Sequence, residues 1–253
     1  MRALRIYTWA LIVTLYVPIG LMVALSFNNS KLPYVWGGFT LRWYEALFSW
    51  GQAWQAILNS VVVALVVSFT ATLLGIFMAY VLRQVKYIAV SQVAVVMPEV
   101  SEALAFAAAL WLVKTYTGVD LFGPVGVFLA HLAYTLPMAH VLLAPYVAYV
   151  SRSAVEAARI LGASELRTMF SVVMPILAPA FVATFLIVFA NSFDTYIKTA
   201  FTTSPGFVTA PILLWSYAAR GRGDPTIYAL ATFMLIPSLV AAAIYFRAVK
   251  RYS

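Results

Sequence analysis

The chain has 253 residues, of which 64% are hydrophobic and 9% are charged, and its mean hydropathy is +0.94. Because about a quarter of the residues in a soluble globular domain are charged, this composition excludes that class and predicts an integral membrane protein. The net charge of +8 does not call for nucleic acid, since most of the cations border apolar segments, where they meet anionic lipid. The absence of cysteine excludes disulfides, thiolate metal sites and thiol catalysis.

Six apolar segments are each long enough to cross a bilayer as a helix, which requires about 20 residues. They are continuous runs and lack the short alternating pattern of a transmembrane barrel. The sequence therefore predicts an all-α, polytopic membrane protein with six transmembrane helices in a single domain, residues 1–253. The predicted spans cover approximately residues 6–27, 57–82, 88–113, 124–150, 176–200 and 226–248.

Lysine and arginine are distributed unevenly between the segments that connect these spans. If the N-terminus is cytoplasmic, ten of the 16 cations lie in inner segments and six in outer ones. The positive-inside rule then places both termini, and the polar segment 151–175, in the cytoplasm. The first span is longer than the apolar core of a signal peptide, so we expect it to be retained.

Two carboxylates lie in the third predicted span. Glu99 and Glu102 follow Pro98, which interrupts a helix, and their spacing of three residues puts them on one helix face. A charged group at the centre of a bilayer costs at least about 2.5 kcal/mol, so such groups often line a transport pathway. A diamine or polyamine would satisfy both carboxylates. The alternative is a kinked end of the span with solvated side chains.

Two histidines lie in the fourth predicted span. His131 and His140 are nine residues apart, and no other ligand cluster accompanies either of them. We therefore expect hydrogen bonds within the helix bundle and no metal site.

The polar segment 151–175 has the pattern of a helix, a turn and a second helix. Ser153 and Glu156 have the spacing of a capping box, which predicts a helix start. Gly162 is suited to end that helix. Ser164 is suited to cap the next one, with Glu165 in its first turn.

This segment resembles the EAA loop of ABC-importer permeases. The matching residues are Glu156, Ala157 and Ala158, then Gly162 after three residues, and Val172 to Pro175 after nine more. Val172 and Met174 stand for the Ile and Leu of the family pattern, which are apolar exchanges of similar size. In that family the loop is cytoplasmic, sits in a groove of an ATPase subunit and transmits its movement. The resemblance implies an ATPase-coupling role for Glu156, Ala157, Ala158, Gly162, Ser164 and Glu165.

The end of the fifth predicted span contains Asp194 and Lys198. Their spacing of four, with the acid first, favours an ion pair along one helix. Together with the segments 26–28, 39–44, 204–206 and 224–225, the run Ser192-Phe193-Asp194 resembles the second permease subunit of the spermidine/putrescine branch. That resemblance makes Asp194, with Glu99 and Glu102, a candidate residue of the substrate pathway.

The resemblance implies a type I permease fold and one half of a translocation pathway for a polyamine or similar small cation. It also implies an inner-membrane location, a second, non-identical permease, two ATPase subunits that hold ATP and Mg²⁺, and an extracytoplasmic binding protein. We expect this chain to bind no cofactor or metal, and, with no catalytic motif in the sequence, to be no enzyme. The alternative is an ATP-independent channel or secondary carrier that uses the intramembrane carboxylates.

Overall fold

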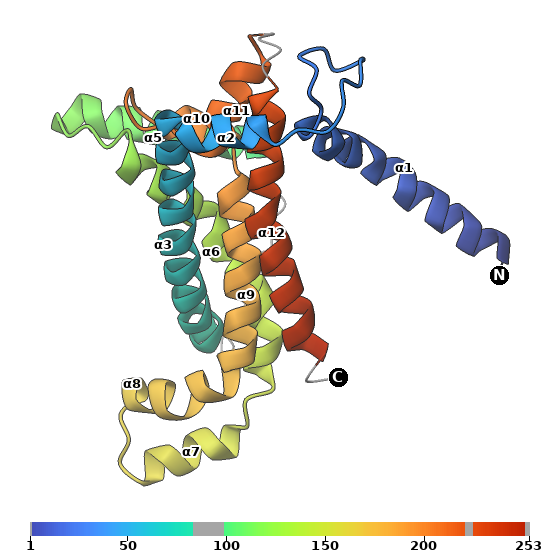
Figure 1. Ribbon diagram of the computed structural model, residues 1–253. Coiled ribbons are helices and arrows are strands. Elements are labelled where there is room, and N and C mark those ends of the chain that lie inside the picture. Colours follow the sequence, from blue (N-terminus) through green and yellow to red (C-terminus); the bar gives the residue numbers. More distant parts are fainter. Residues whose placement is uncertain (1, 83–98, 221–224, 251–253) are drawn as a thin grey trace. The chain divides into compact units, whose positions relative to one another are not determined.

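The computed structural model describes residues 2–82, 99–220 and 225–250, and within these residues it contains helices and no strands (Figure 1). Five described segments are long and apolar enough to cross a membrane. They are Leu4–Ser26, Gly51–Leu82, Pro124–Ala148, Glu165–Asp194 and Thr226–Ile244. The predicted all-α, polytopic membrane fold is therefore confirmed.

The third predicted span, 88–113, is described only from Glu99 onward, where α5 (Glu99–Thr117) begins. Residues 83–98, which include Pro98, lie outside the described residues, so the predicted kink stays a prediction. The fifth predicted span, 176–200, differs from the structure at its end. Helix α9 (Met174–Asp194) stops at Asp194, Thr195 has extended backbone, and a separate helix α10 (Ile197–Thr202) follows.

The chain packs as two compact units. The first comprises Met1–Leu58 and Thr209–Pro237, and the second comprises Asn59–Val208 and Ser238–Ser253. Two helices, α3 (Gly51–Leu82) and α12 (Thr226–Lys250), contribute to both units. The single domain predicted for residues 1–253 stays a prediction.

The first unit contains α1 (Arg2–Ser26), α2 (Arg42–Ser49) and α11 (Ala210–Ala218). Buried Asn28 organises the loop after α1, because its amide donates to the Val35 carbonyl at 2.8 Å and accepts from the Gly37 amide at 2.8 Å. The Trp43 indole donates to the Asn28 carbonyl at 2.7 Å and so ties α2 to this loop.

The second unit is built around α3, α6 (Pro124–Ala148) and α9. Helices α6 and α9 pack against each other, and α10 packs against both α5 and α6. A Cβ on Gly75 of α3 would lie 2.9 Å from the Ala139 Cβ of α6, so glycine permits this close approach. The main buried apolar cluster, called the lower core here, consists of Ile76, Ala79, Tyr80, Leu143, Val147, Val150, Val155, Met169, Val173, Leu177 and Ala180.

Candidate functional site

The first candidate region is the α7–α8 hairpin, residues 151–173, which contains α7 (Arg152–Ile160), α8 (Glu165–Thr168) and the π-helical turn η1 (Met169–Val173). The predicted capping box at its start is wrong. Ser151 occupies the N-cap position, so Ser153 already lies inside the helix, where its Oγ is 2.6 Å from the Ser151 Oγ. The backbone leaves the extended region at Ser151, two residues earlier than the pattern predicts.

The end of α7 agrees with the sequence prediction. Gly162 has a φ of +83° and therefore adopts the left-handed conformation that glycine tolerates best. The Gly162 amide donates to the Arg159 carbonyl at 2.9 Å, and the Ala163 amide donates to the Ala158 carbonyl at 3.0 Å. These two bonds form a Schellman motif, which satisfies carbonyls at the end of the helix.

Two polar contacts define the start of α8. The Ser164 Oγ accepts a hydrogen bond from the Arg167 amide at 3.3 Å, so the predicted cap is confirmed. The Glu165 Oε1 lies 2.7 Å from the Arg159 Nη2 of α7 and joins the two helices. Its hydrogen bond raises the pKa of the Arg159 guanidinium above its usual value.

Ser164→Ala is expected to destabilise the start of α8 by about 1 kcal/mol, because the Arg167 amide loses its acceptor. Amide hydrogen exchange over residues 164–168 would show this as faster exchange. Ser153→Ala is the matched control, since Ser153 caps neither helix. Equal effects of the two replacements would contradict the assignment of the cap.

One side of the hairpin is buried against the membrane helices, and the other side is exposed. Val155, Met169 and Val173 are buried in the lower core. Ile160 and Leu161, at the turn, are 86% and 87% exposed, and Glu156 is exposed as well. The chain then continues into α9 through η1, where the Met174 amide donates to the Met169 carbonyl just before Pro175, which lacks an amide proton. Pro175 therefore does not interrupt the chain of helices, and η1 links the hairpin directly to α9.

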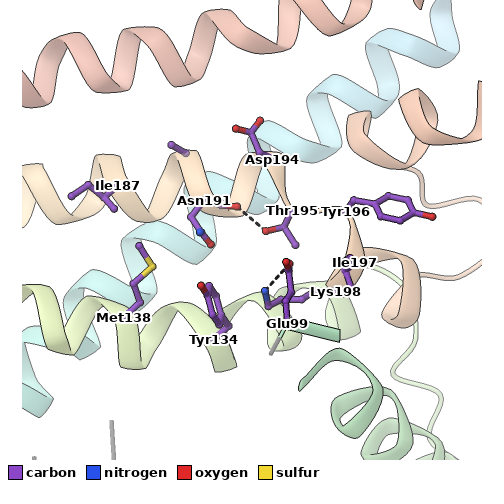
Figure 2. A pocket seen from close by; sticks show the side chains of 11 residues that line it. Glu99, Tyr134, Met138, Ile187, Asn191, Asp194, Thr195, Tyr196, Ile197 and Lys198 are labelled. Atoms are coloured by element: carbon purple, nitrogen blue, oxygen red, sulfur yellow. Dashed lines mark hydrogen bonds and ion pairs between the residues drawn. The ribbon is translucent and has the colours of Figure 1, made fainter. Parts of the chain in front are cut away.

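The second candidate region is a pocket of about 650 Å³ in the second unit (Figure 2). Its lining comes from the start of α5, the middle of α6, the end of α9 and the start of α10. The residues are Glu99, Tyr134, Met138, Ile187, Ala190, Asn191, Asp194, Thr195, Tyr196, Ile197 and Lys198. The structure thus brings Glu99 and Asp194, which are 95 positions apart in the sequence, to one pocket. Glu102 is not part of its lining.

The ion pair in this pocket differs from the predicted one. Lys198 Nζ donates to Glu99 Oε1 at 2.9 Å, whereas the prediction paired Lys198 with Asp194. The prediction is wrong because the helix ends at Asp194, so the spacing of four residues no longer places the two side chains on one face. Asp194 instead accepts a hydrogen bond from Ser238 Oγ of α12 at 3.0 Å.

Two other polar residues of the lining, Tyr134 and Asn191, are notable for their surroundings. The Lys198 ammonium lies 3.7 Å from the centroid of the Tyr134 ring, a cation–π geometry. The Asn191 Oδ1 is buried and has no hydrogen-bond partner among the described residues. The sequence analysis did not identify Asn191 as a pathway residue, and it considered Lys198 only as the ion-pair partner of Asp194. A lysine in a predicted membrane span is nevertheless itself an indication of function.

Three of the residues considered in the sequence analysis, His131, His140 and Glu102, lie outside the pocket lining. Buried His131 lies 2.8 Å from the Ser192 Oγ and 2.9 Å from the Thr199 Oγ1, as predicted for a histidine within the bundle. His140 is also buried, but the described part of the chain offers its ring nitrogens no partner. The Glu102 Oε2 is also buried and has no hydrogen-bond partner among the described residues.

These features define a helical membrane transport subunit: it has several apolar spans, and its second unit contains a polar hairpin packed against α3, α6 and α9 and a charged pocket lined by α5, α6, α9 and α10. Residues 71–253 match the family described as "Binding-protein-dependent transport system inner membrane component". The chain belongs to this family, and it is a permease subunit of an ABC importer in the inner membrane.

Individual relatives agree with this assignment. The chain is 30% identical over 229 residues to the spermidine/putrescine transport system permease protein PotC of Haemophilus influenzae, covering 89% of this chain and 88% of that protein. It is 31% identical over 229 residues to the putrescine transport system permease protein PotI of Escherichia coli K12, covering 87% and 81%. A solved bacterial ABC transporter that imports the acidic polysaccharide alginate has the same fold, with a TM-score of 0.71 at 14% identity and coverage of 99% and 93%.

Proposed function

We propose that this permease forms half of a translocation pathway for a small organic cation of the polyamine class, and that ATP hydrolysis by a separate subunit drives the transport. The observation that carries the proposal is the pocket, which is lined by two acidic residues from distant parts of the chain, Glu99 and Asp194. Carboxylates and an aromatic face are groups that recognise an organic ammonium. The polyamine class is taken from the names of the relatives.

The α7–α8 hairpin is the proposed docking element for the ATPase. Its exposed tip offers apolar and acidic side chains to a partner, while its buried side chains contact α3, α6 and α9. A movement of the hairpin would therefore reach the helices that carry the pocket. Glu156, Ala157, Ala158, Gly162, Ser164 and Glu165 are the proposed coupling residues. Such coupling requires the hairpin to bind the ATPase differently in two states of the transporter.

The proposed assembly has a second, non-identical permease, two ATPase subunits with ATP and Mg²⁺, and an external binding protein that delivers the solute. Both termini and the hairpin would be cytoplasmic. An accessibility assay with single cysteines tests this orientation, because the native chain has no cysteine. A label that reaches position 160 or 161 only from outside the cell would overturn the proposed docking of an ATPase.

Uptake of labelled putrescine by the reconstituted transporter tests the role of the pocket. Asp194→Asn removes one of its two carboxylates, so we expect uptake at a low solute concentration to fall at least about tenfold, which corresponds to about 1.4 kcal/mol. Asp120→Asn is the matched control, because Asp120 is a half-exposed loop residue paired with Lys114. Equal uptake by both variants would remove Asp194 from the pathway. Uptake driven by an ion gradient without ATP would favour the alternative of a secondary carrier.

A further inference from the structure

We propose that His131 is a positioning residue of the pocket, because it holds α10 in the position that keeps Lys198 away from Asp194. Without this hold, the two residues are free to form the ion pair that their spacing favours. Lys198 would then occupy the carboxylate that the proposed function assigns to the solute. The inference rests on the proposed function, since it assumes that Asp194 receives an ammonium group of a polyamine.

The break between α9 and α10 determines which carboxylate Lys198 pairs with. In a continuous helix Asp194 and Lys198, four positions apart, would lie on one face and attract each other. The structure instead has extended backbone at Thr195 and begins α10 at Ile197. Lys198 consequently donates to Glu99 Oε1 at 2.9 Å, and Figure 2 shows the Asp194 carboxylate directed away from that pair.

His131 of α6 connects the two sides of this break. Its Nδ1 lies 2.8 Å from the Ser192 Oγ of α9, and its Nε2 lies 2.9 Å from the Thr199 Oγ1 of α10. All three side chains are buried. Because a buried polar group that loses its partner is costly, these two hydrogen bonds resist a movement of α10 relative to α6 and α9.

The hydrogen bonds assign the proton of the imidazole ring to Nε2. The Thr199 hydroxyl donates to the Thr195 carbonyl at 3.2 Å, so it accepts from His131 Nε2–H. Both partners of the ring are hydroxyls, which do not offset a positive charge, so the buried ring is neutral. Its Nδ1 is therefore unprotonated and accepts from the Ser192 hydroxyl. Ser192 thus orients the ring, and the Nε2–H group holds α10.

Three carboxylates compete for the Lys198 ammonium. Glu99 accepts its hydrogen bond, and Glu102, which does not line the pocket, attracts it electrostatically from three positions further along α5. Asp194 accepts a hydrogen bond from the neutral hydroxyl of Ser238, so no cation among the described residues pairs with it. If α10 moves and Lys198 reaches Asp194, an ammonium group of the solute has to displace the lysine before it can bind. The position of α10 therefore sets the affinity of the pocket for a diamine.

Equilibrium binding of 1,4-diaminobutane to the intact, purified transporter in nanodiscs tests the inference with two replacements of His131. His131→Asn places a polar atom near the position of Nδ1 and can still bond Ser192, but it does not reach Thr199. His131→Gln reaches the position of Nε2 and can still donate to Thr199. We expect the affinity to fall at least about fivefold, or about 1 kcal/mol, in His131→Asn and to stay within about twofold of the wild-type value in His131→Gln.

Replacement of Lys198 separates this positioning role from a packing defect. In a Lys198→Met background no lysine ammonium can reach Asp194, so His131→Asn should have no further effect on the affinity. Lys198→Met also frees Glu99, which changes the affinity by itself, so the effect of His131→Asn is compared within each background. Lys198→Gln serves the same purpose if Lys198→Met does not fold.

The possible outcomes distinguish the inference from the proposed function. Equal affinities of His131→Asn and His131→Gln, or the same loss from His131→Asn in both Lys198 backgrounds, would overturn the inference and leave the proposed function standing. Thr199→Val removes the same hydrogen bond from the side of α10 and replaces His131→Asn in the comparison of backgrounds if that variant does not fold. Absence of 1,4-diaminobutane binding by the wild-type transporter would overturn both.

Discussion

Glu156→Lys is expected to lower ATP-dependent uptake at least about a hundredfold while the protein stays in the membrane. Loss of one charged partner in a buried interface costs about 2–5 kcal/mol, and a reversed charge adds repulsion. Glu156 is exposed and lies on α7 beside the buried anchor Val155, so the replacement changes the docking surface and leaves the lower core intact. The measurements are uptake and co-purification of the ATPase.

Glu45→Lys is the matched control for this prediction. Glu45 is an exposed glutamate on another short helix, α2, and its replacement makes the same change in net charge. We expect this variant to transport normally. Normal uptake by the Glu156→Lys variant, with the ATPase bound at wild-type yield, would contradict a docking role for the hairpin.

Gly162→Leu tests the same docking surface by shape. Gly162 and Gly118 both have a positive φ, of +83° and +75°, and neither would place a Cβ within 4 Å of another heavy atom. Leucine at either position therefore carries a similar backbone strain, about 1–3 kcal/mol. A much larger loss of uptake for Gly162→Leu than for Gly118→Leu would show that the surface at Gly162 is contacted by a partner.

Glu99→Gln is expected to lower the free energy of unfolding of the second unit by about 2–4 kcal/mol, because it removes the counter-ion of a buried lysine. Lys198 is 3% exposed, and its ammonium would keep the face of the Tyr134 ring but lose the carboxylate that accepts its hydrogen bond. Thermal unfolding of the purified transporter, followed by a probe in this unit, measures the effect.

The double variant distinguishes a lost ion pair from a general packing defect. Glu99→Gln/Lys198→Met removes both charges, so much of the lost stability should return. Asp120→Asn is the control for loss of a carboxylate from an exposed ion pair, and we expect little change from it. A double variant that is less stable than Glu99→Gln alone would show that Lys198 stabilises the unit for a reason other than its charge.

The fold class of this protein could be predicted from the sequence because the signal is local. Each span is recognisable as a continuous apolar run in the sequence. In lipid such a run forms a helix, because a helix satisfies the hydrogen bonds of its own backbone. The α7–α8 hairpin was predictable for a similar reason. Gly162 and Ser164 act on hydrogen bonds within a few residues of themselves, and the structure confirms both. The start of α7 shows the limit of this reasoning. Two nearby serines, Ser151 and Ser153, are both suitable N-cap residues, and in the structure Ser151 occupies the N-cap position.

The pocket depends on tertiary structure. The spacing of Asp194 and Lys198 indicates an ion pair only if the helix is continuous, and the break after Asp194 turns Lys198 toward Glu99, 99 positions away. Sequence alone identified the acidic residues as unusual for a membrane span. An ion pair forms between groups that are neighbours in space. The packing of α10 against α5 and α6 therefore decided that Lys198 pairs with Glu99 and leaves Asp194 without a cationic partner among the described residues.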